Sequence, residues 1–171
     1  MLEYAKKHEP KLKELYWDIA FDPFYQFIDY SAFREDIKLP EDTYRQNDFV
    51  SVWNGEIIGH ITYSINRIAN SVDSFGCVHF GKNYPYIFGK DLVTALKEIF
   101  EKFKFNKISF CVVIGNPIEK TYDKLVQKYG GRIVGIWKQD RRLLDGNLYD
   151  SKCYEILAED YFNTIKNNEK K

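Results

Sequence analysis

Cys77 and His79 stand two residues apart in a segment of strand-like composition, residues 71–80. Alternate side chains of a strand share a face, so this imidazole could activate the thiol as a nucleophile. The chain holds three cysteines, and the other two, Cys111 and Cys153, are far from the first and from each other. An odd number of widely spaced cysteines favours free, buried thiols in a reducing compartment over disulfides. We therefore keep the Cys77–His79 nucleophile as the weaker alternative.

The segment that follows this strand could bind a phosphate. Residues 81–88 form a predicted loop, and a helix is predicted from Gly89 because apolar residues recur there at three- and four-residue spacing. Residues 107–114 then make an apolar run without polar alternation, as in a strand covered on both faces. This crossover unit brings a helix N-terminus to the end of a strand, where free backbone N–H groups and the helix dipole favour a phosphate.

The remaining histidines, His8 and His60, have no metal-ligand spacing to each other, to His79 or to the cysteines, so no metal site is predicted. His60 falls on a predicted strand and could work as a base. A solvated or hydrogen-bonded strand histidine is the more common case, and we keep both interpretations.

Composition limits the classes of protein to which this chain can belong. The 171 residues include 25 basic and 25 acidic side chains, and 44% of the residues are hydrophobic, so the chain is expected to bury a core. The balanced charge without a basic stripe argues against nucleic acid as a partner. No apolar run is long enough to span a membrane, and the N-terminus lacks the apolar region of a secretion signal. We therefore expect a cytoplasmic protein.

Two hairpins and four further helices complete the predicted order of elements. One hairpin covers residues 49–65 around Asn54-Gly55, and another covers residues 132–157 around Asp145-Gly146. Helices are predicted over residues 9–20, from Asp22-Pro23, over 118–129 and from Ala158, and a charged loop or lid over 34–48. No linker or repeat divides the chain, so we predict a single mixed α/β (α+β) domain over residues 1–171. Its sheet is expected to be mostly antiparallel, with one parallel crossover and flanking helices.

Over residues 47–157 the chain resembles the GNAT superfamily of acyl-CoA-dependent N-acyltransferases, both in the order of elements and in local sequence. Three segments carry most of the resemblance: WNGEIIGHI at residues 53–61, GKDLVTAL at residues 89–96, and the unit from Asn116-Pro117 through Tyr122-Asp123-Lys124 to Gly130-Gly131. The last hairpin, around Asp145-Gly146, is similar to that of several subfamilies. The resemblance implies the GNAT fold with acetyl-CoA as co-substrate.

Two positions depart from the family pattern. The family's phosphate loop usually combines a Gln or Arg with two small residues, and here only Gly89 matches it. The glutamate base that is common on the strand before this loop is absent, and Asp73 is the nearest acid.

The resemblance implies direct attack of an amine on the thioester, and with it a set of catalytic residues. Tyr122 matches the family's tyrosine and would protonate the departing thiolate, the alternative being a core tyrosine. Asp73 and His79 compete as the base. A backbone N–H group near residues 77–79 would hold the thioester oxygen, at a distortion of the strand by Gly76.

The same resemblance implies the cofactor contacts. The predicted cofactor-binding residues are Cys77, Val78, His79, Phe88, Gly89, Lys90, Asp91 and Asn116. The pyrophosphate is expected on Gly89 and the N–H groups of Lys90 and Asp91. Asn116 could hold the pantetheine arm or cap the helix that follows it.

The implied function is an N-acetyltransferase that moves the acetyl group of acetyl-CoA to a primary amine of a small molecule or a protein. No metal, nucleic acid or membrane takes part in it, and a homodimer is left open. The alternative is a non-catalytic module on the same fold, which binds acyl-CoA without turnover or serves as a protein-interaction surface.

Overall fold

Seven strands form one mixed sheet in the order β1-β2-β3-β4-β5-β7-β6. The computed structural model describes residues 1–28 and 37–168. The strands are β1 (Leu2–Tyr4), β2 (Gln46–Trp53), β3 (Glu56–Asn66), β4 (Ser71–His79), β5 (Lys107–Val113), β6 (Arg132–Arg142) and β7 (Leu148–Leu157). The helices are α1 (Glu9–Ile19), α2 (Pro85–Glu101), α3 (Glu119–Lys128) and α4 (Ala158–Asn168), with 3₁₀ turns η1 (Ala5–His8) and η2 (Pro23–Tyr25). The predicted mixed α/β architecture is confirmed.

Both predicted hairpins are present. Gly55 and Gly146 sit in their turns at φ +82°, a conformation that glycine adopts without a steric penalty. The helix predicted from Asp22 is only the single turn η2, where the Asp22 carboxylate accepts a hydrogen bond from the N–H group of Phe24. β1 was not predicted, because a strand of three residues carries no periodic signal.

The predicted lid over residues 34–48 lies partly outside the described residues. Its last three residues belong to β2, which begins at Gln46 rather than at the predicted Phe49. None of the helices in the part of the chain that the structure describes is long and apolar enough to cross a membrane.

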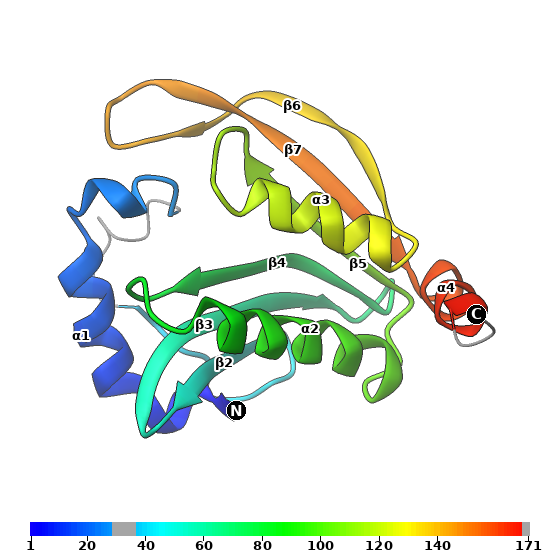
Figure 1. Cartoon of the computed structure of the whole chain (residues 1–171), viewed down its shortest axis with the longest axis horizontal. Helices are drawn as coiled ribbons and strands as arrows, with labels where there is room; N and C mark the ends of the chain where they lie inside the picture. The colour runs from blue at the N-terminus through cyan, green and yellow to red at the C-terminus, as the bar shows by residue number, and fades with distance from the viewer. Residues whose placement is uncertain (29–36, 169–171) are drawn as a thin grey trace.

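The sheet opens between its two central strands. β4 and β5 run parallel and pair only at their starts, Ser71 with Lys107 and Val72 with Ile108. Figure 1 shows the two strands diverging from there toward their C-terminal ends. All other neighbouring strands pair antiparallel along most of their length. The crossover through α2 therefore joins two strands that leave a wedge-shaped gap between them.

A β-bulge in β4 helps to turn this strand away from β5. Thr62 of β3 faces Gly76, and Ser64 faces Asp73, so two residues of β4, Ser74 and Phe75, lie opposite one residue of β3. Ser74 has φ +55°, in the left-handed region. Such bulges bend a strand and increase its twist. The expected distortion is present, but it is centred on Ser74 and not on Gly76.

α2 begins four residues earlier than predicted. Tyr84 takes the left-handed conformation at φ +59°, and Pro85, whose ring presets a helical φ, follows at the first helical position. The Tyr84 carbonyl accepts hydrogen bonds from the N–H groups of Ile87 and Phe88. Gly89 is thus inside the helix, and the prediction of a helix start at Gly89 is wrong.

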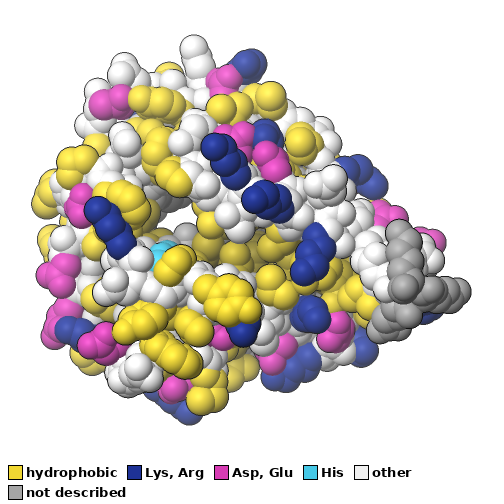
Figure 2. Space-filling view, viewed as in Figure 1, with side chains coloured by type: hydrophobic (Ala, Val, Ile, Leu, Met, Phe, Trp, Pro, Cys, Tyr) yellow, Lys and Arg dark blue, Asp and Glu magenta, His cyan; other side chains and the backbone are white. Residues whose placement is uncertain are grey.

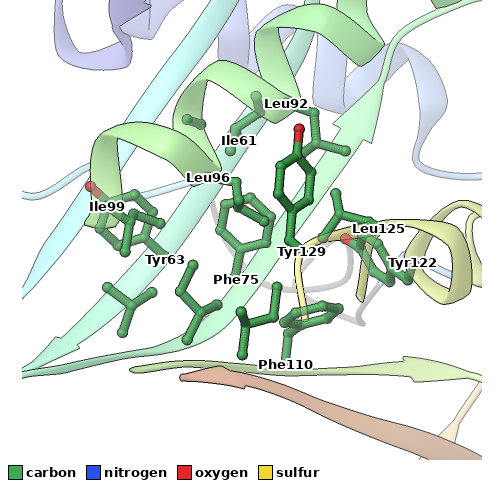
Figure 3. Close-up of a cluster of buried hydrophobic side chains, with 14 of the residues drawn as sticks. Ile61, Tyr63, Phe75, Leu92, Leu96, Ile99, Phe110, Tyr122, Leu125 and Tyr129 are labelled. Atoms are coloured by element: carbon green, nitrogen blue, oxygen red, sulfur yellow. The ribbon is translucent and has the colours of Figure 1, made fainter. Parts of the chain in front are cut away.

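The helices cover the sheet on both faces. α2, α3 and α4 pack on one face, and their apolar side chains form the main core with those of the strands (Figure 3). Leu92 and Leu96 of α2, Phe110 of β5 and Tyr122 of α3 belong to this core. α1 covers the other face over β2, β3 and β4, where Leu12 packs in a second, smaller core. The gap between β4 and β5 is thus flanked by helices of both layers.

Candidate active site

The edge of β4 that faces the gap carries backbone groups without a strand partner. The N–H group of Phe80 donates to the carbonyl of Ile58 in β3. Successive N–H groups of a strand point to opposite edges, so the N–H group of Val78 also turns toward β3, and those of Cys77 and His79 turn toward the gap. Two backbone donors, about 7 Å apart along the strand, therefore face the space where β5 has moved away.

Tyr122 of α3 lies beside the side chain of Cys77. The hydroxyl oxygen of Tyr122 is 3.6 Å from the Cys77 sulfur, a hydrogen bond in which either group can donate. Burial raises the pKa of Tyr122 well above its ordinary value, and a charge on Cys77 would raise it further. Burial likewise raises the pKa of the Cys77 thiol, to about 11, against a smaller lowering by Tyr122. Both groups are therefore protonated at neutral pH, and Cys77 is not a thiolate nucleophile.

His79 does not face Cys77 as an activating base. Its Nε2–H group donates to the carbonyl of Asn83 at 2.8 Å, and its ring stacks on Phe88 with centroids 4.9 Å apart. Because Nε2 is the donor, Nδ1 is the acceptor nitrogen of the neutral ring. The stacking joins the end of β4 to the first turns of α2.

Asp73, the other predicted base, lies at the closed end of the gap. Its carboxylate accepts a hydrogen bond of 2.7 Å from the hydroxyl of Ser109 in β5. It lies four positions before Cys77 along β4, a separation of up to about 13 Å in an extended strand. The structure therefore separates Asp73 from the Cys77–Tyr122 pair.

The three residues predicted to bind the pyrophosphate, Gly89, Lys90 and Asp91, all lie inside α2. Inside α2, the N–H groups of Gly89, Lys90 and Asp91 are committed to the helical hydrogen bonds of the turns before them. The Asp91 carboxylate accepts from the Ser51 hydroxyl at 2.7 Å, and the Lys90 ammonium lies 4.4 Å from the centre of the Tyr86 ring. The predicted amide nest at Gly89 is wrong, because the helix starts at Pro85.

Phe88 is buried and fills the space beside Gly59 of β3. A Cβ atom built on Gly59 would lie 2.2 Å from the Phe88 ring, so only glycine leaves room for it. Phe88 therefore seats α2 on the sheet and does not reach a ligand through its ring face, which His79 covers.

Asn116 makes the capping contact that was the alternative to cofactor binding. Its side-chain oxygen accepts a hydrogen bond of 3.1 Å from the N–H group of Ile118, just before α3. Val78 packs with its side chain against the α1 layer. Neither side chain is directed by these contacts toward the Cys77–Tyr122 pair.

α3, which carries Tyr122, is held to β7 by charges. The Lys152 ammonium lies 2.5 Å from a Glu119 carboxylate oxygen and 3.1 Å from one of Asp123. The Tyr154 hydroxyl also donates to Asp123 at 2.8 Å. Tyr122 is thus placed by a helix that is fixed at its first two turns.

Sequence reasoning did not foresee a second polar cluster, on the α1 face of the sheet. It joins Tyr16 of α1, His60 of β3 and Asp48 of β2 by hydrogen bonds. These residues come from three elements up to 44 positions apart, so no local pattern links them. His60 alone was considered, as a single strand histidine.

Figure 2 shows the molecule hollowed between the α1–η2 segment on one side and the helices α2 and α3 on the other, in the view of Figure 1. The end of β4 points into this region (Figure 1). Hydrophobic side chains line much of the hollow (Figure 2). Among the described residues, no three His, Cys, Asp or Glu side chains gather in a way that could hold a metal ion.

Comparison with solved structures places this fold among acetyltransferases. The chain superposes on the spermidine N-acetyltransferase SpeG from Vibrio cholerae in complex with CoA and spermine with a TM-score of 0.72, at 18% identity over 95% of this chain and 97% of that one. A point mutant of the same enzyme gives 0.71 at 19% identity, covering 95% and 98%. A further structure, described as a "probable acetyltransferase", gives 0.59 at 14% identity, and the chain spans only 65% of its length.

Neither the models of known protein families nor the curated protein sequences match this chain. The likeness is therefore one of fold. It confirms the predicted fold class, a mixed, mostly antiparallel sheet with one parallel crossover and flanking helices.

Proposed function

We propose that this chain is an N-acetyltransferase that moves the acetyl group of acetyl-CoA to a primary amine of a small molecule or a protein. The observation that carries the proposal is the gap between β4 and β5, with two backbone donors on its edge and Tyr122 beside it. The solved structures compared above, which share this fold, are described as acetyltransferases, and one of them holds CoA and spermine.

The thioester lies in the gap, where its carbonyl oxygen accepts a hydrogen bond from the N–H group of Cys77 or from that of His79. Donors fixed in a strand stabilise the negative charge that develops on this oxygen, because they need no reorganisation during the reaction. The diphosphate of CoA then lies at the start of α2, where the backbone of residues 82–86 and the helix dipole attract an anion. Lys82 and Lys90 are the cations of this region.

Tyr122 donates a proton, or a strong hydrogen bond, to the departing thiolate. Its raised pKa keeps it protonated until that charge forms beside it. Cys77, which now bonds to the Tyr122 hydroxyl, gives way to the CoA sulfur as hydrogen-bond partner.

The direct test measures free CoA thiol during incubation with acetyl-CoA and an amine panel: spermidine, spermine, an aminoglycoside and a peptide with a free N-terminus. Tyr122→Phe is expected to lower turnover about 10²-fold or more, with unchanged affinity for CoA. Tyr129→Phe, a buried tyrosine on the same side of the core (Figure 3), is the control and is expected to keep turnover. Full turnover in Tyr122→Phe would remove this residue from the reaction.

A second candidate is an acyl-CoA-binding module without turnover. It is favoured by the phosphate loop, which lacks the family's small residues, and by the absence of a glutamate on β4. Saturating binding of acetyl-CoA in calorimetry, with no CoA released to any amine of the panel, would support this candidate over the enzyme.

A further inference from the structure

The Tyr16–His60–Asp48 cluster is unusual because it buries a carboxylate and an imidazole in an otherwise apolar layer. His60 is 3% exposed and Asp48 is 7% exposed. His60 Nε2 lies 3.1 Å from Asp48 Oδ1, and His60 Nδ1 lies 2.9 Å from the Tyr16 hydroxyl. Burial of such groups is costly unless they are paired, and here each is paired.

The direction of the hydrogen bonds follows from the carboxylate. An ionised carboxylate only accepts, and the second Asp48 oxygen already accepts from the Gln46 side-chain amide at 2.8 Å. Nε2 of His60 must therefore donate to Asp48, which leaves Nδ1 of the neutral ring as an acceptor for the Tyr16 O–H group. Nδ1 of His60 is thus the acceptor that faces Tyr16, and the Nε2–H group on the other side of the ring faces Asp48.

The cluster runs from the interior to the mouth of the gap. Tyr16 is partly exposed, unlike His60 and Asp48. Its ring packs edge-on against Phe80, the residue directly after β4, with centroids 5.3 Å apart. His60, which the Tyr16 hydroxyl contacts, lies opposite Val78 of β4, between Cys77 and His79, whose N–H groups face the gap. Tyr16 and Tyr122 therefore lie on opposite faces of the sheet, beside the open stretch of β4.

We propose that Tyr16 is the group that accepts a proton from the substrate ammonium, and that it relays its own proton to His60. This inference rests on the proposed acetyl transfer. Tyr16 would be a catalytic residue, and His60 and Asp48 would be positioning residues that act through it.

The protons balance as follows. An N–H bond of the ammonium breaks, an O–H bond forms at Tyr16, and the former Tyr16 proton moves to Nδ1 of His60, from which it later leaves to solvent. The free amine attacks the thioester carbon, the C–S bond breaks, and the electron pair leaves with sulfur, which takes the Tyr122 proton. The second proton lost from nitrogen as the amide forms restores Tyr122.

The test uses the panel amine with the highest wild-type rate and follows kcat against pH. The titratable groups that face His60 are Asp48 from β2 and Tyr16 from α1, whereas Cys77 of β4 bonds to Tyr122 and His79 of β4 stacks on Phe88. His60→Gln keeps polar side-chain atoms but cannot take up the proton. Its kcat is expected to fall about 10²-fold at neutral pH and to recover as the pH approaches the pKa of the amine itself.

Tyr16→Phe keeps the ring that packs against Phe80 and removes only the hydroxyl group. This variant tests the proposal if His60→Gln fails to fold. It is expected to show the same loss at neutral pH and the same recovery at high pH, with unchanged CoA binding. Tyr44→Phe, at a tyrosine that is 60% exposed, is the control with wild-type rates.

Four results of these experiments are distinguishable. Wild-type kcat in Tyr16→Phe would overturn the relay, and so would a loss by the same factor at every pH together with weaker CoA binding, which marks a structural anchor. A wild type that binds CoA but acetylates no amine would instead overturn the proposed function. Loss at neutral pH with recovery at high pH supports the relay.

Discussion

At the scale of single residues, the fit between Gly59 and Phe88 decides how α2 meets the sheet. A methyl group on Gly59 would meet the Phe88 ring at 2.2 and 2.5 Å and the Val78 carbonyl oxygen at 2.9 Å. The Phe88 ring occupies the space that the missing side chain of Gly59 leaves, and His79 stacks on this ring. Gly59 of β3 therefore helps to position Phe88 and His79 at the mouth of the gap.

Gly59→Ala is expected to lower the free energy of unfolding by about 1–3 kcal/mol, the usual cost of overpacking. Urea unfolding measures it. Gly135→Ala in β6 is the matched control, because nothing lies within 4 Å of its added methyl group. Equal stability of the two variants would contradict the packing argument, whereas relief of Gly59→Ala by Phe88→Leu would support it.

At the scale of elements, α3 depends on the cluster of Lys152 with Glu119 and Asp123. The hydrogen bond from Lys152 is the main cause that lowers the pKa of Glu119, and those from Tyr154 and then Lys152 lower the pKa of Asp123. A carboxyl group with a lowered pKa in the folded state contributes stability above its unfolded pKa, and this stability is lost as the pH falls through the folded value.

Lys152→Met is therefore expected to lower the free energy of unfolding at pH 7 by roughly 1 kcal/mol, since the pairs are partly exposed. The difference from the wild type should shrink as the pH falls below the ordinary pKa values of 4.5 for Glu119 and 3.8 for Asp123 toward their lowered values in the folded state. Denaturant unfolding across this range measures it. Lys102→Met, which removes an exposed pair with Glu98, is the control. A difference that stays constant with pH would contradict the assignment.

Local sequence signals account for most elements and for part of the site. Turn residues such as Asn54-Gly55 and the three- and four-residue spacing of Leu92 and Leu96 act within a few positions, so the hairpins and helices could be predicted. The start of α2 could not, because the signal of Pro85 at a first helical position competed with that of Gly89. The Tyr16–His60–Asp48 cluster depends on how α1 packs on the sheet, which no local pattern contains.

At the scale of the whole molecule, the core is rich in hydroxyl and thiol groups that must stay neutral. Burial is the main cause that raises the pKa of several tyrosines and of Cys77: Tyr16, Tyr63, Tyr122, Tyr154, Tyr161 and Cys77. A group whose pKa is raised on folding holds its proton more tightly in the folded state. Its contribution to the free energy of unfolding is complete below the pKa that the group has in the unfolded chain. This contribution is lost as the pH rises toward the pKa that the group has in the folded protein.

We therefore expect the free energy of unfolding to fall steadily above about pH 9, first through Cys77, whose pKa rises from 9.0 to about 11, and through Cys111, whose pKa burial also raises, and then through the tyrosines. The Cys77 share at pH 10 is about 1 kcal/mol. Urea unfolding of the wild type and Cys77→Ala at pH 8 and pH 10 measures it. The variant should lose less stability over this interval, and equal losses would contradict the burial argument.

The central claim is that acyl-CoA occupies the gap between β4 and β5, with its diphosphate at the start of α2. Hydrogen–deuterium exchange with and without CoA, at about 100 times its Kd, tests this most directly, since ligand binding there adds about 2.7 kcal/mol of stability. We predict slower exchange in peptides that cover residues 75–79 and 82–88, beyond any general slowing seen in β6. Bound CoA with no such added protection at the open edge of β4 would contradict the account.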